Sequence, residues 1–322
     1  MKKEHIELIK AAANAVKQKG KINHIYYVAC GGSKATLMPA QYVMDCECDV
    51  PSSVYTSNEF VYRVPKALSE KSIVITCSFS GTTPETVEAT KLSRSKGALT
   101  ISLTYDTDSP LWKEAECPLH HDDKPGSDDN FAVLHAMNYN ILNTLQPSEK
   151  YEKAIKAIDC LDNLVQLNIE KYKNSAIEFG RTHKREEVIY TMGSGGCYPT
   201  VYSFTICLMM EMQWIHSNSI HSGEYFHGPF EITDYDVPFL IVKSSGRTRY
   251  LDERAHAFCK KFSDKITLVD TDDFIMTGID EEVREFITPI ICMTVLRQYA
   301  NALSEFRGHP MSVRRYMWKM EY

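Results

Sequence analysis

The pattern that most constrains the fold occurs in both halves of the chain: a short apolar strand runs into a glycine- and serine-rich turn at the start of a helix. In the first half, Ile25–Ala29 leads into Cys30-Gly31-Gly32-Ser33, and in the second half Val188-Ile189-Tyr190 leads into Gly193-Ser194-Gly195-Gly196. Strand, turn, helix and strand in this order predict parallel βαβ units with helices on both faces of a sheet. We therefore expect an internal duplication of one α/β domain.

The length of 322 residues fits two domains of ordinary size. Residues 148–180 are charged and helical with little strand signal, so the predicted junction lies there, between a first domain over 1–150 and a second over 151–322 that ends in a tail. Each predicted domain is a doubly wound, flavodoxin-like parallel sheet flanked by helices. The expected elements are helices at 3–19, 84–97, 198–214, 248–263 and 289–305, and strands at 25–29, 73–76, 99–103, 188–190, 239–242 and 266–269.

The composition argues against several classes of function. Lys and Arg total 36 against 42 Asp and Glu, a net charge of −6, which disfavours a nucleic-acid partner or a membrane surface. The longest apolar stretches are too short or too interrupted to span a bilayer. Ten cysteines contain no CxxC pair, and the start of the sequence shows no signal peptide. We expect reduced thiols in a cytoplasmic protein.

A hydroxyl-rich loop follows the second predicted strand. Ser78, Ser80, Thr82 and Thr83 surround Gly81 just before Pro84, which suits the first turn of a helix. Hydroxyls and the free N–H groups of a helix start can bind one anion, and Gly81 lets the backbone approach it. The alternative is a helix cap without a ligand. The loop is neither a Walker A sequence nor GxGxxG, so nucleotides are not favoured.

Two residues in the second half are candidates for proton transfer. Glu211 interrupts an apolar helical run, where an acid pairs with a cation, faces a cavity or is desolvated, unless it lies on a polar surface stripe. His227 stands before Gly228-Pro229, and histidine suits proton transfer near neutral pH. The spacing of histidines and acids here fits no standard metal pattern, so neither a metal nor an organic cofactor is expected; the residues concerned are His216, His221, Glu224 and His227.

The hydroxyl-rich loop resembles the SxSGxT phosphate loop of the sugar-isomerase (SIS) family. Cys30-Gly31-Gly32-Ser33 is similar to that family's upstream CGxS turn, and the two motifs occur in the family's order. The resemblance implies two SIS domains that bind a small sugar phosphate. It implies substrate contacts at Ser33, Ser78, Ser80 and Thr83, with Gly32 and Gly81 beside them. Phe79 stands where the isomerase domain of glucosamine-6-phosphate synthase usually has glutamine, so one polar contact is expected to be missing.

The segment Ser222–Ile232 resembles the SGEFxHGPxEI motif of fructosamine-6-phosphate deglycases and the GExxHGP motif of glucosamine-6-phosphate synthases. In these families a glutamate sixteen residues before the histidine is the general base, and Glu211 holds that place. The resemblance thus implies Glu211 as base and His227 as acid, with support from Glu224, Ser194 and Tyr316. Because the synthase histidine comes from a neighbouring subunit, a homodimer with a shared site is expected.

The C-terminal tail distinguishes the deglycases from the glucosamine-6-phosphate synthases. Tyr316 stands where the synthase has a lysine, and the ending Arg314-Arg315-Tyr316…Glu321-Tyr322 is similar to that of the deglycases. No glutaminase domain precedes the first SIS motif in this sequence. Both features favour a deglycase that needs no cofactor, over an aldose–ketose or amino-sugar-phosphate isomerase or a non-catalytic sugar-phosphate sensor. Arg247, Arg249 and the tail arginines are expected to be solvated.

Overall fold

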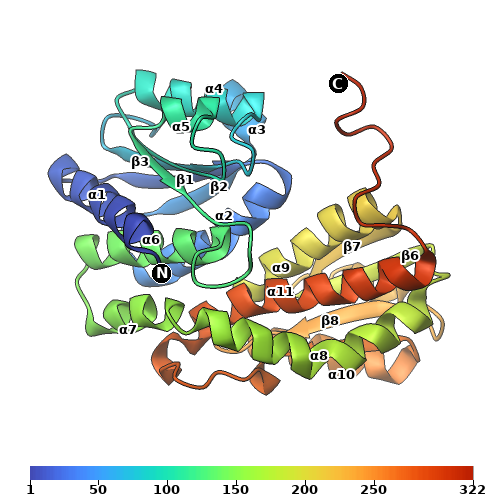
Figure 1. Cartoon of the computed structure of the whole chain (residues 1–322). Coiled ribbons are helices and arrows are strands. Elements are labelled where there is room, and N and C mark those ends of the chain that lie inside the picture. The colour runs from blue at the N-terminus through green and yellow to red at the C-terminus, as the bar shows by residue number, and fades with distance from the viewer. Residues whose placement is uncertain (322) are drawn as a thin grey trace. The chain divides into compact units, whose positions relative to one another are not determined.

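The computed structural model describes residues 1–321. By their contacts, these residues form two compact units. The first comprises residues 1–163 and 278–287, and the second comprises residues 164–277 and those from 288 onward (Figure 1). Nothing in the sequence indicated that residues 278–287, which follow most of the second unit in the chain, belong to the first unit.

The first unit contains a five-stranded sheet in which every neighbouring pair is parallel. Its strand order is β2-β1-β3-β4-β5, the flavodoxin-like order. The strands are β1 (His24–Ala29), β2 (Ser52–Tyr55), β3 (Ser72–Cys77), β4 (Leu99–Thr104) and β5 (Cys117–His120). The helices are α1 (Lys3–Lys19), α2 (Gly31–Glu47), α3 (Ser57–Arg63), α4 (Pro84–Ser95), α5 (Pro110–Glu114), α6 (Asn130–Leu145) and α7 (Glu149–Ile158).

Helices cover both faces of this sheet, as its sequence requires. Strands β3 and β4 are buried along their whole length, which fits their continuous apolar and threonine runs. Helices α1 and α6 lie side by side on one face, and α3 and α4 lie on the other (Figure 1). One core cluster joins Tyr26 and Val74 of the sheet to Phe60 of α3 and Ala89 of α4. Burial on both faces fixes the register of the central strands.

The second unit repeats the arrangement with four parallel strands in the order β7-β6-β8-β9. The order matches β2-β1-β3-β4 of the first unit, which confirms the predicted duplication. Its strands are β6 (Val188–Gly193), β7 (His216–His221), β8 (Phe239–Lys243) and β9 (Ile266–Asp270). Its helical segments are α8 (Leu161–His183), η1 (Gly195–Cys197), α9 (Tyr198–Ser203), η2 (Phe204–Gln213), η3 (Pro229–Ile232), α10 (Arg249–Phe262), η4 (Thr271–Asp273) and α11 (Glu281–Arg307), with the first residues of α8 and α11 in the first unit.

The α/β fold with two parallel sheets is confirmed, but several details differ from the expectation. Strands β2, β5 and β7 were not predicted, because these edge strands are partly exposed and carry serine, histidine or proline in place of an apolar run. The last helix begins at Glu281 rather than at 289, and it contains Pro289. The predicted helix over 198–214 is α-helical only to Ser203 and is a π-helix from Phe204.

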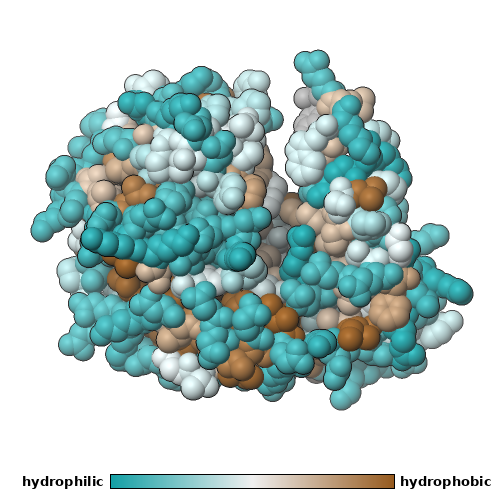
Figure 2. Space-filling view, viewed as in Figure 1, coloured by the Kyte–Doolittle hydropathy of each residue, from teal (hydrophilic) through white to brown (hydrophobic). Residues whose placement is uncertain are grey.

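Charged and polar side chains cover most of the visible surface, and hydrophobic residues appear on it as separate patches (Figure 2). All ten cysteines are free thiols, five of them buried. No helix within residues 1–321 has the length and apolar character that a bilayer crossing requires.

Helices α8 and α11 approach each other closely at Gly180. A Cβ atom there would lie 2.6 Å from the carbonyl carbon of Ala302 and 2.8 Å from the amide nitrogen of Leu303. We predict that Gly180→Ala lowers the free energy of unfolding by about 1–3 kcal/mol, because overpacking outweighs the gain of about 1 kcal/mol in helix propensity. Urea denaturation measures the change. Asn174→Ala, at an exposed position of α8, is the control and should raise the free energy of unfolding by no more than about 0.7 kcal/mol, through helix propensity alone. A stabilised Gly180→Ala protein would contradict the close approach.

Candidate active site

Two turns leave the first sheet at the same edge. Strands β1 and β3 are neighbours, and Ala29 pairs with Cys77 at their carboxyl ends. The Cys30–Ser33 turn therefore starts α2 beside the loop that starts α4 at Pro84. Neither helix has a side-chain cap at its N-terminus, so the N–H groups of the first turn that have no backbone partner are left for a ligand or water.

The loop after β3 orders its own hydroxyls. Ser78 Oγ is hydrogen-bonded to Thr83 Oγ1 at 2.8 Å, and Ser80 Oγ to Thr82 Oγ1 at 2.8 Å. Ser78 is buried, whereas Ser80 and Thr82 are exposed. The structure thus brings together three of the four predicted phosphate contacts, Ser78, Ser80 and Thr83, in one turn.

Gly81 has no room for a side chain. Its φ of +66° lies in the left-handed region, and its N–H donates to the Ser78 carbonyl at 3.1 Å. A Cβ atom at this position would lie 2.1 Å from Ser109 Oγ and 2.6 Å from Thr104 Oγ1. The close contact and the backbone conformation both require glycine.

Ser33, the fourth predicted contact, is half-buried in the first turn of α2. Burial raises the pKa of the Cys77 thiol to about 12, and a hydrogen bond with the Ser33 hydroxyl opposes that rise. The interaction places Ser33 at the end of β3, next to Ser78. Gly31 and Gly32 are exposed before it, and Gly31 has a φ of +54°.

An aromatic cluster that was not predicted lies beside this loop. The Phe79 ring stacks on Tyr105 with centroids 5.3 Å apart and planes at 2°. His121 lies 5.5 Å from Phe79, and burial lowers the pKa of its imidazole. His121 Nε2 is buried without a hydrogen-bond partner in the described structure. Because Tyr105 directly follows β4, its place at a strand end was the available sequence signal.

In the second unit, Glu211 lies on the π-helix η2 (Phe204–Gln213). Its Oε1 forms an ion pair with Arg314 Nη2 at 2.8 Å. The Arg314 side chain is only 7% exposed, against 23% for Glu211. Of the alternatives that the sequence left open for Glu211, the structure selects pairing with a cation. Long π-helices are rare and often occur at functional sites.

The C-terminal tail holds Arg314 in place. The Arg314 Nη1 group donates to the carbonyls of Met311 at 2.7 Å and Val313 at 2.9 Å, and the guanidinium lies 5.2 Å from the Trp318 ring. Before the tail, the His309 carbonyl accepts a hydrogen bond from Gln213 Nε2 at 2.9 Å, at the end of the π-helix. Residues 309–318 therefore fold back on the helix that carries Glu211.

The expectation of solvated arginines is wrong for two of them. Arg314 is buried on Glu211, and Arg249 donates from both terminal nitrogens to Asp270 at 2.7 and 2.8 Å. Sequence spacing gave no sign of either pair, because the partners are 103 and 21 residues apart in the chain.

His227 lies in a turn over residues 222–228, and the buried side chain of Tyr225 attaches this turn to an aromatic cluster. Tyr225 is fully buried, and its ring packs with Phe226, Phe230 and Phe258. His227 itself is exposed, and its ring forms no hydrogen bond or ion pair within the described part of the chain. Gly228 follows with a φ of +133°. The turn thus exposes His227 to solvent, while the aromatic packing of Tyr225 attaches the turn to the core of the second unit.

Two of the predicted supporting residues are also on the surface. Glu224, in the same turn, is exposed and uses its backbone N–H to bond the His221 carbonyl at 2.8 Å. Tyr316 has 60% of its surface exposed and lies in the tail, two residues beyond Arg314.

Ser194, the third supporting residue, lies in the turn after β6. It is buried against another loop of the second unit, the one that corresponds to the hydroxyl-rich loop. This loop follows β8 and has the sequence Ser244-Ser245-Gly246-Arg247-Thr248. Ser194 Oγ lies 3.4 Å from Ser244 Oγ and 3.3 Å from the Thr248 carbonyl. The buried Asp252 carboxylate accepts from Ser244 N at 2.9 Å and from Ser222 Oγ at 2.6 Å. Burial raises the pKa of Asp252, and these hydrogen bonds oppose the rise.

Comparisons with known proteins agree with this fold. A family model described as the SIS domain matches residues 20–145. The chain is 46% identical to the fructosamine deglycase FrlB of Bacillus subtilis, over 94% of both chains. It is 27% identical to a fructoselysine 6-phosphate deglycase of Escherichia coli, over 92% of this chain and 86% of the other. The C-terminal domain of glucosamine-fructose-6-phosphate aminotransferase from Francisella tularensis has the same fold, with a TM-score of 0.78, 19% identity and 95% of each chain covered.

We predict that Gly81→Ala weakens the binding of inorganic phosphate at least about tenfold, since left-handed backbone alone costs an alanine about 1–2 kcal/mol and the methyl group collides with Ser109. Isothermal titration calorimetry measures the affinity. Gly20→Ala is the matched control, because Gly20 has a φ of +76° but nothing within 4 Å of a Cβ atom. Equal phosphate affinity in both variants would show that the loop is not the anion site.

Proposed function

The chain belongs to the SIS-domain family of fructosamine deglycases, and we propose that it converts a 6-phosphorylated Amadori compound, such as fructoselysine 6-phosphate, into glucose 6-phosphate and a free amine. The observation that carries the proposal is the Glu211–Arg314 ion pair. It holds one carboxylate in a fixed orientation on a largely apolar π-helix, and the arginine comes from the tail whose sequence resembles that of the deglycases.

The substrate phosphate would bind at the edge of the first sheet. Ser33, Ser78, Ser80 and Thr83 would supply hydroxyls, and the N-termini of α2 and α4 would supply N–H groups. Gly32 and Gly81 would let the backbone come close to the phosphate. Binding through a phosphate that does not react provides the energy to orient the reacting carbons.

Glu211 would remove a proton from C1 of the open-chain ketoamine. The electron pair moves to form a C1=C2 double bond, and His227 protonates the oxygen on C2, which gives an eneaminol. Return of a proton to C2 gives an iminium ion, and loss of the proton on its nitrogen gives an aldimine of glucose 6-phosphate, in which C2 keeps its hydroxyl group. Water then adds to the C1=N bond, and the amine leaves. Each general acid–base step contributes about 10²–10⁴-fold to the rate.

His227 would act in a homodimer. Its side chain is exposed and has no partner among residues 1–321, so it is free to reach a substrate bound by a neighbouring subunit. Ten free thiols fit a reducing compartment, and we propose that the enzyme works in the cytoplasm.

An aldose–ketose or amino-sugar-phosphate isomerase is the second candidate. It would use the same base and the same hydroxyl loop, and the shared fold with the aminotransferase domain supports it. Tyr316 in the place of the synthase lysine favours the deglycase. A non-catalytic sensor would have no need for a glutamate held by a buried arginine.

The proposed reaction predicts that the purified protein releases glucose 6-phosphate from fructoselysine 6-phosphate, measured with a coupled dehydrogenase. Glu211→Gln should lower kcat by about 10²–10⁴-fold, because it removes the base but keeps the size of the side chain. Fructose 6-phosphate and glucosamine 6-phosphate are run in parallel. Conversion of these alone would establish the isomerase, and binding without any turnover would establish the sensor.

Arg314 is proposed as a positioning residue for Glu211. Arg314→Met should lower kcat by about 10²-fold with little change in KM, since a base displaced by about 1 Å loses that much. Arg314→Lys should recover part of the rate because it restores the charge. Arg315→Met is the control: Arg315 is exposed, and its guanidinium lies 4.4 Å from the Trp214 ring. Equal kcat values for the two methionine variants, with circular dichroism unchanged, would exclude the role.

A further inference from the structure

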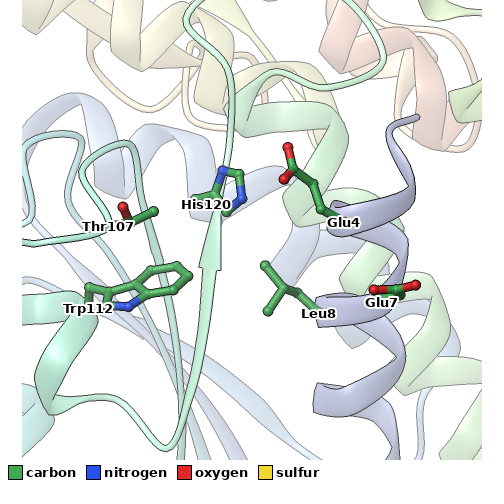
Figure 3. Close-up of a pocket in the computed structure, with 6 residues that line it drawn as sticks. All are labelled: Glu4, Glu7, Leu8, Thr107, Trp112 and His120. Atoms are coloured by element: carbon green, nitrogen blue, oxygen red, sulfur yellow. The ribbon is translucent and has the colours of Figure 1, made fainter.

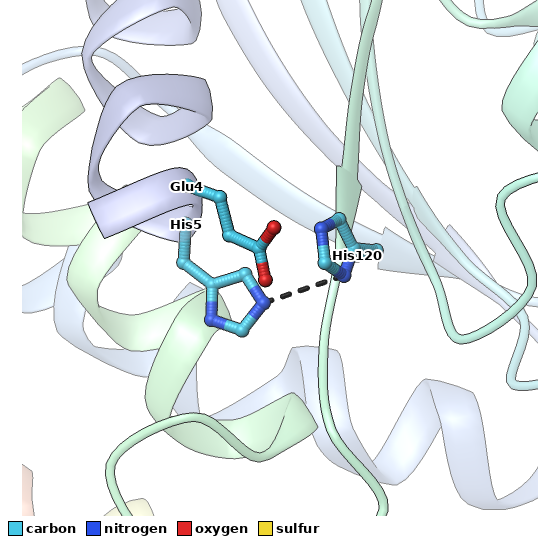
Figure 4. Close-up of side chains that lie close together, drawn as sticks. All are labelled: Glu4, His5 and His120. Atoms are coloured by element: carbon cyan, nitrogen blue, oxygen red, sulfur yellow. Dashed lines mark hydrogen bonds between the residues drawn. The ribbon is translucent and has the colours of Figure 1, made fainter. Parts of the chain in front are cut away.

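A cluster of two histidines and one carboxylate lies in the first unit, outside the proposed active site. His5 and Glu4 come from the first turn of α1, and His120 ends β5 (Figure 4). One ligand atom from each residue lies within 4.8 Å of the other two. His5 is completely buried.

His5 is held by a second carboxylate. Its Nδ1 is hydrogen-bonded to Asp128 Oδ1 at 2.6 Å. When His5 donates its Nδ1 proton to Asp128, the lone pair of its Nε2 is available to a metal ion. A carboxylate that fixes a histidine tautomer in this way is typical of zinc sites.

The Nε2 atom of His5 faces the other histidine (Figure 4). His5 Nε2 lies 3.3 Å from His120 Nδ1, and the ring planes meet at 73°. Two nitrogens bound to one tetrahedral zinc ion at about 2.0–2.1 Å lie about 3.3–3.4 Å apart.

A pocket of ≈ 370 Å³ opens beside His120 and is lined by Glu4, Glu7, Leu8, Thr107, Trp112 and His120 (Figure 3). Glu4 reaches toward His120 across it, and the pocket leaves room for a water molecule as a further ligand. The adjacent cations are already paired: the terminal amine with Asp159 at 3.0 Å and Lys2 with Asp122 at 2.8 Å. They therefore oppose a bound cation less than free charges would.

We propose that His5, His120 and Glu4 bind one zinc ion, with water as the fourth ligand and Asp128 orienting His5. The ion would connect the start of α1 to the end of β5. It takes no part in the proposed proton transfers, so the site stands or falls independently of the deglycase activity.

The test uses the full-length protein, freed of metal with a chelator, and Zn²⁺ alone as the probe. Competition with a chromophoric chelator measures affinity, and elemental analysis measures stoichiometry. We expect one zinc ion per chain and a higher melting temperature with Zn²⁺. Asp128→Asn should weaken binding about 10–100-fold although it removes no ligand, because it disturbs the tautomer of His5.

His120→Gln combined with Glu4→Gln should abolish binding at this site. Both side chains lie at the edge of the pocket, so these changes spare the buried His5. His24→Gln is the control, since His24 is a partly buried histidine of the same unit that bonds Ser53 Oγ at 3.0 Å. If wild type binds no more zinc than the double variant, the contact between His5 and His120 is a plain hydrogen bond and the proposal is wrong.

Discussion

The parallel pairing of β1 with β3 is the interaction on which the rest of the first unit depends. Because Ala29 pairs with Cys77, the two turns that follow these strands are brought to one edge, and two helices begin there together. The buried hydroxyl of Ser78 and the close packing of Gly81 on Ser109 then fix the loop before any ligand arrives. A loop of fixed shape loses little entropy when it binds an anion.

A different constraint orders the second unit. Glu211 is a carboxylate on a mostly apolar helix, and the ion pair with Arg314 stabilises it. Without Glu211, the buried charge of Arg314 would lose this carboxylate partner. The C-terminal tail therefore has to fold over the end of the π-helix for the carboxylate to keep its orientation. Trp214, with a left-handed φ of +57°, ends that helix, and its ring packs on His309 of the returning chain. The C-terminal tail thus supports Glu211, the residue that we propose as the base.

Local sequence was sufficient for the fold class and for most elements. Long apolar runs such as that of β3, and the Pro84 start of α4, depend on neighbours in the chain and were predicted within a residue or two. The family motif likewise singled out Glu211 and His227. What could not be predicted depends on distant partners: the Glu211–Arg314 pair, the His5–His120 contact and the stacking of Phe79 on Tyr105. The π-helical form of residues 204–213 has no sequence signature at all.

The two halves share one loop design but use it differently. In the first half the hydroxyls around Gly81 are open to solvent at Ser80 and Thr82. In the second half the Asp252 carboxylate accepts hydrogen bonds from the amide and the hydroxyl of Ser244 in the corresponding loop. An acid on the same chain has an effective concentration that free phosphate does not approach in solution. We therefore expect Asp252 to keep phosphate from the second loop, so that the duplicated fold would bind one phosphate per chain.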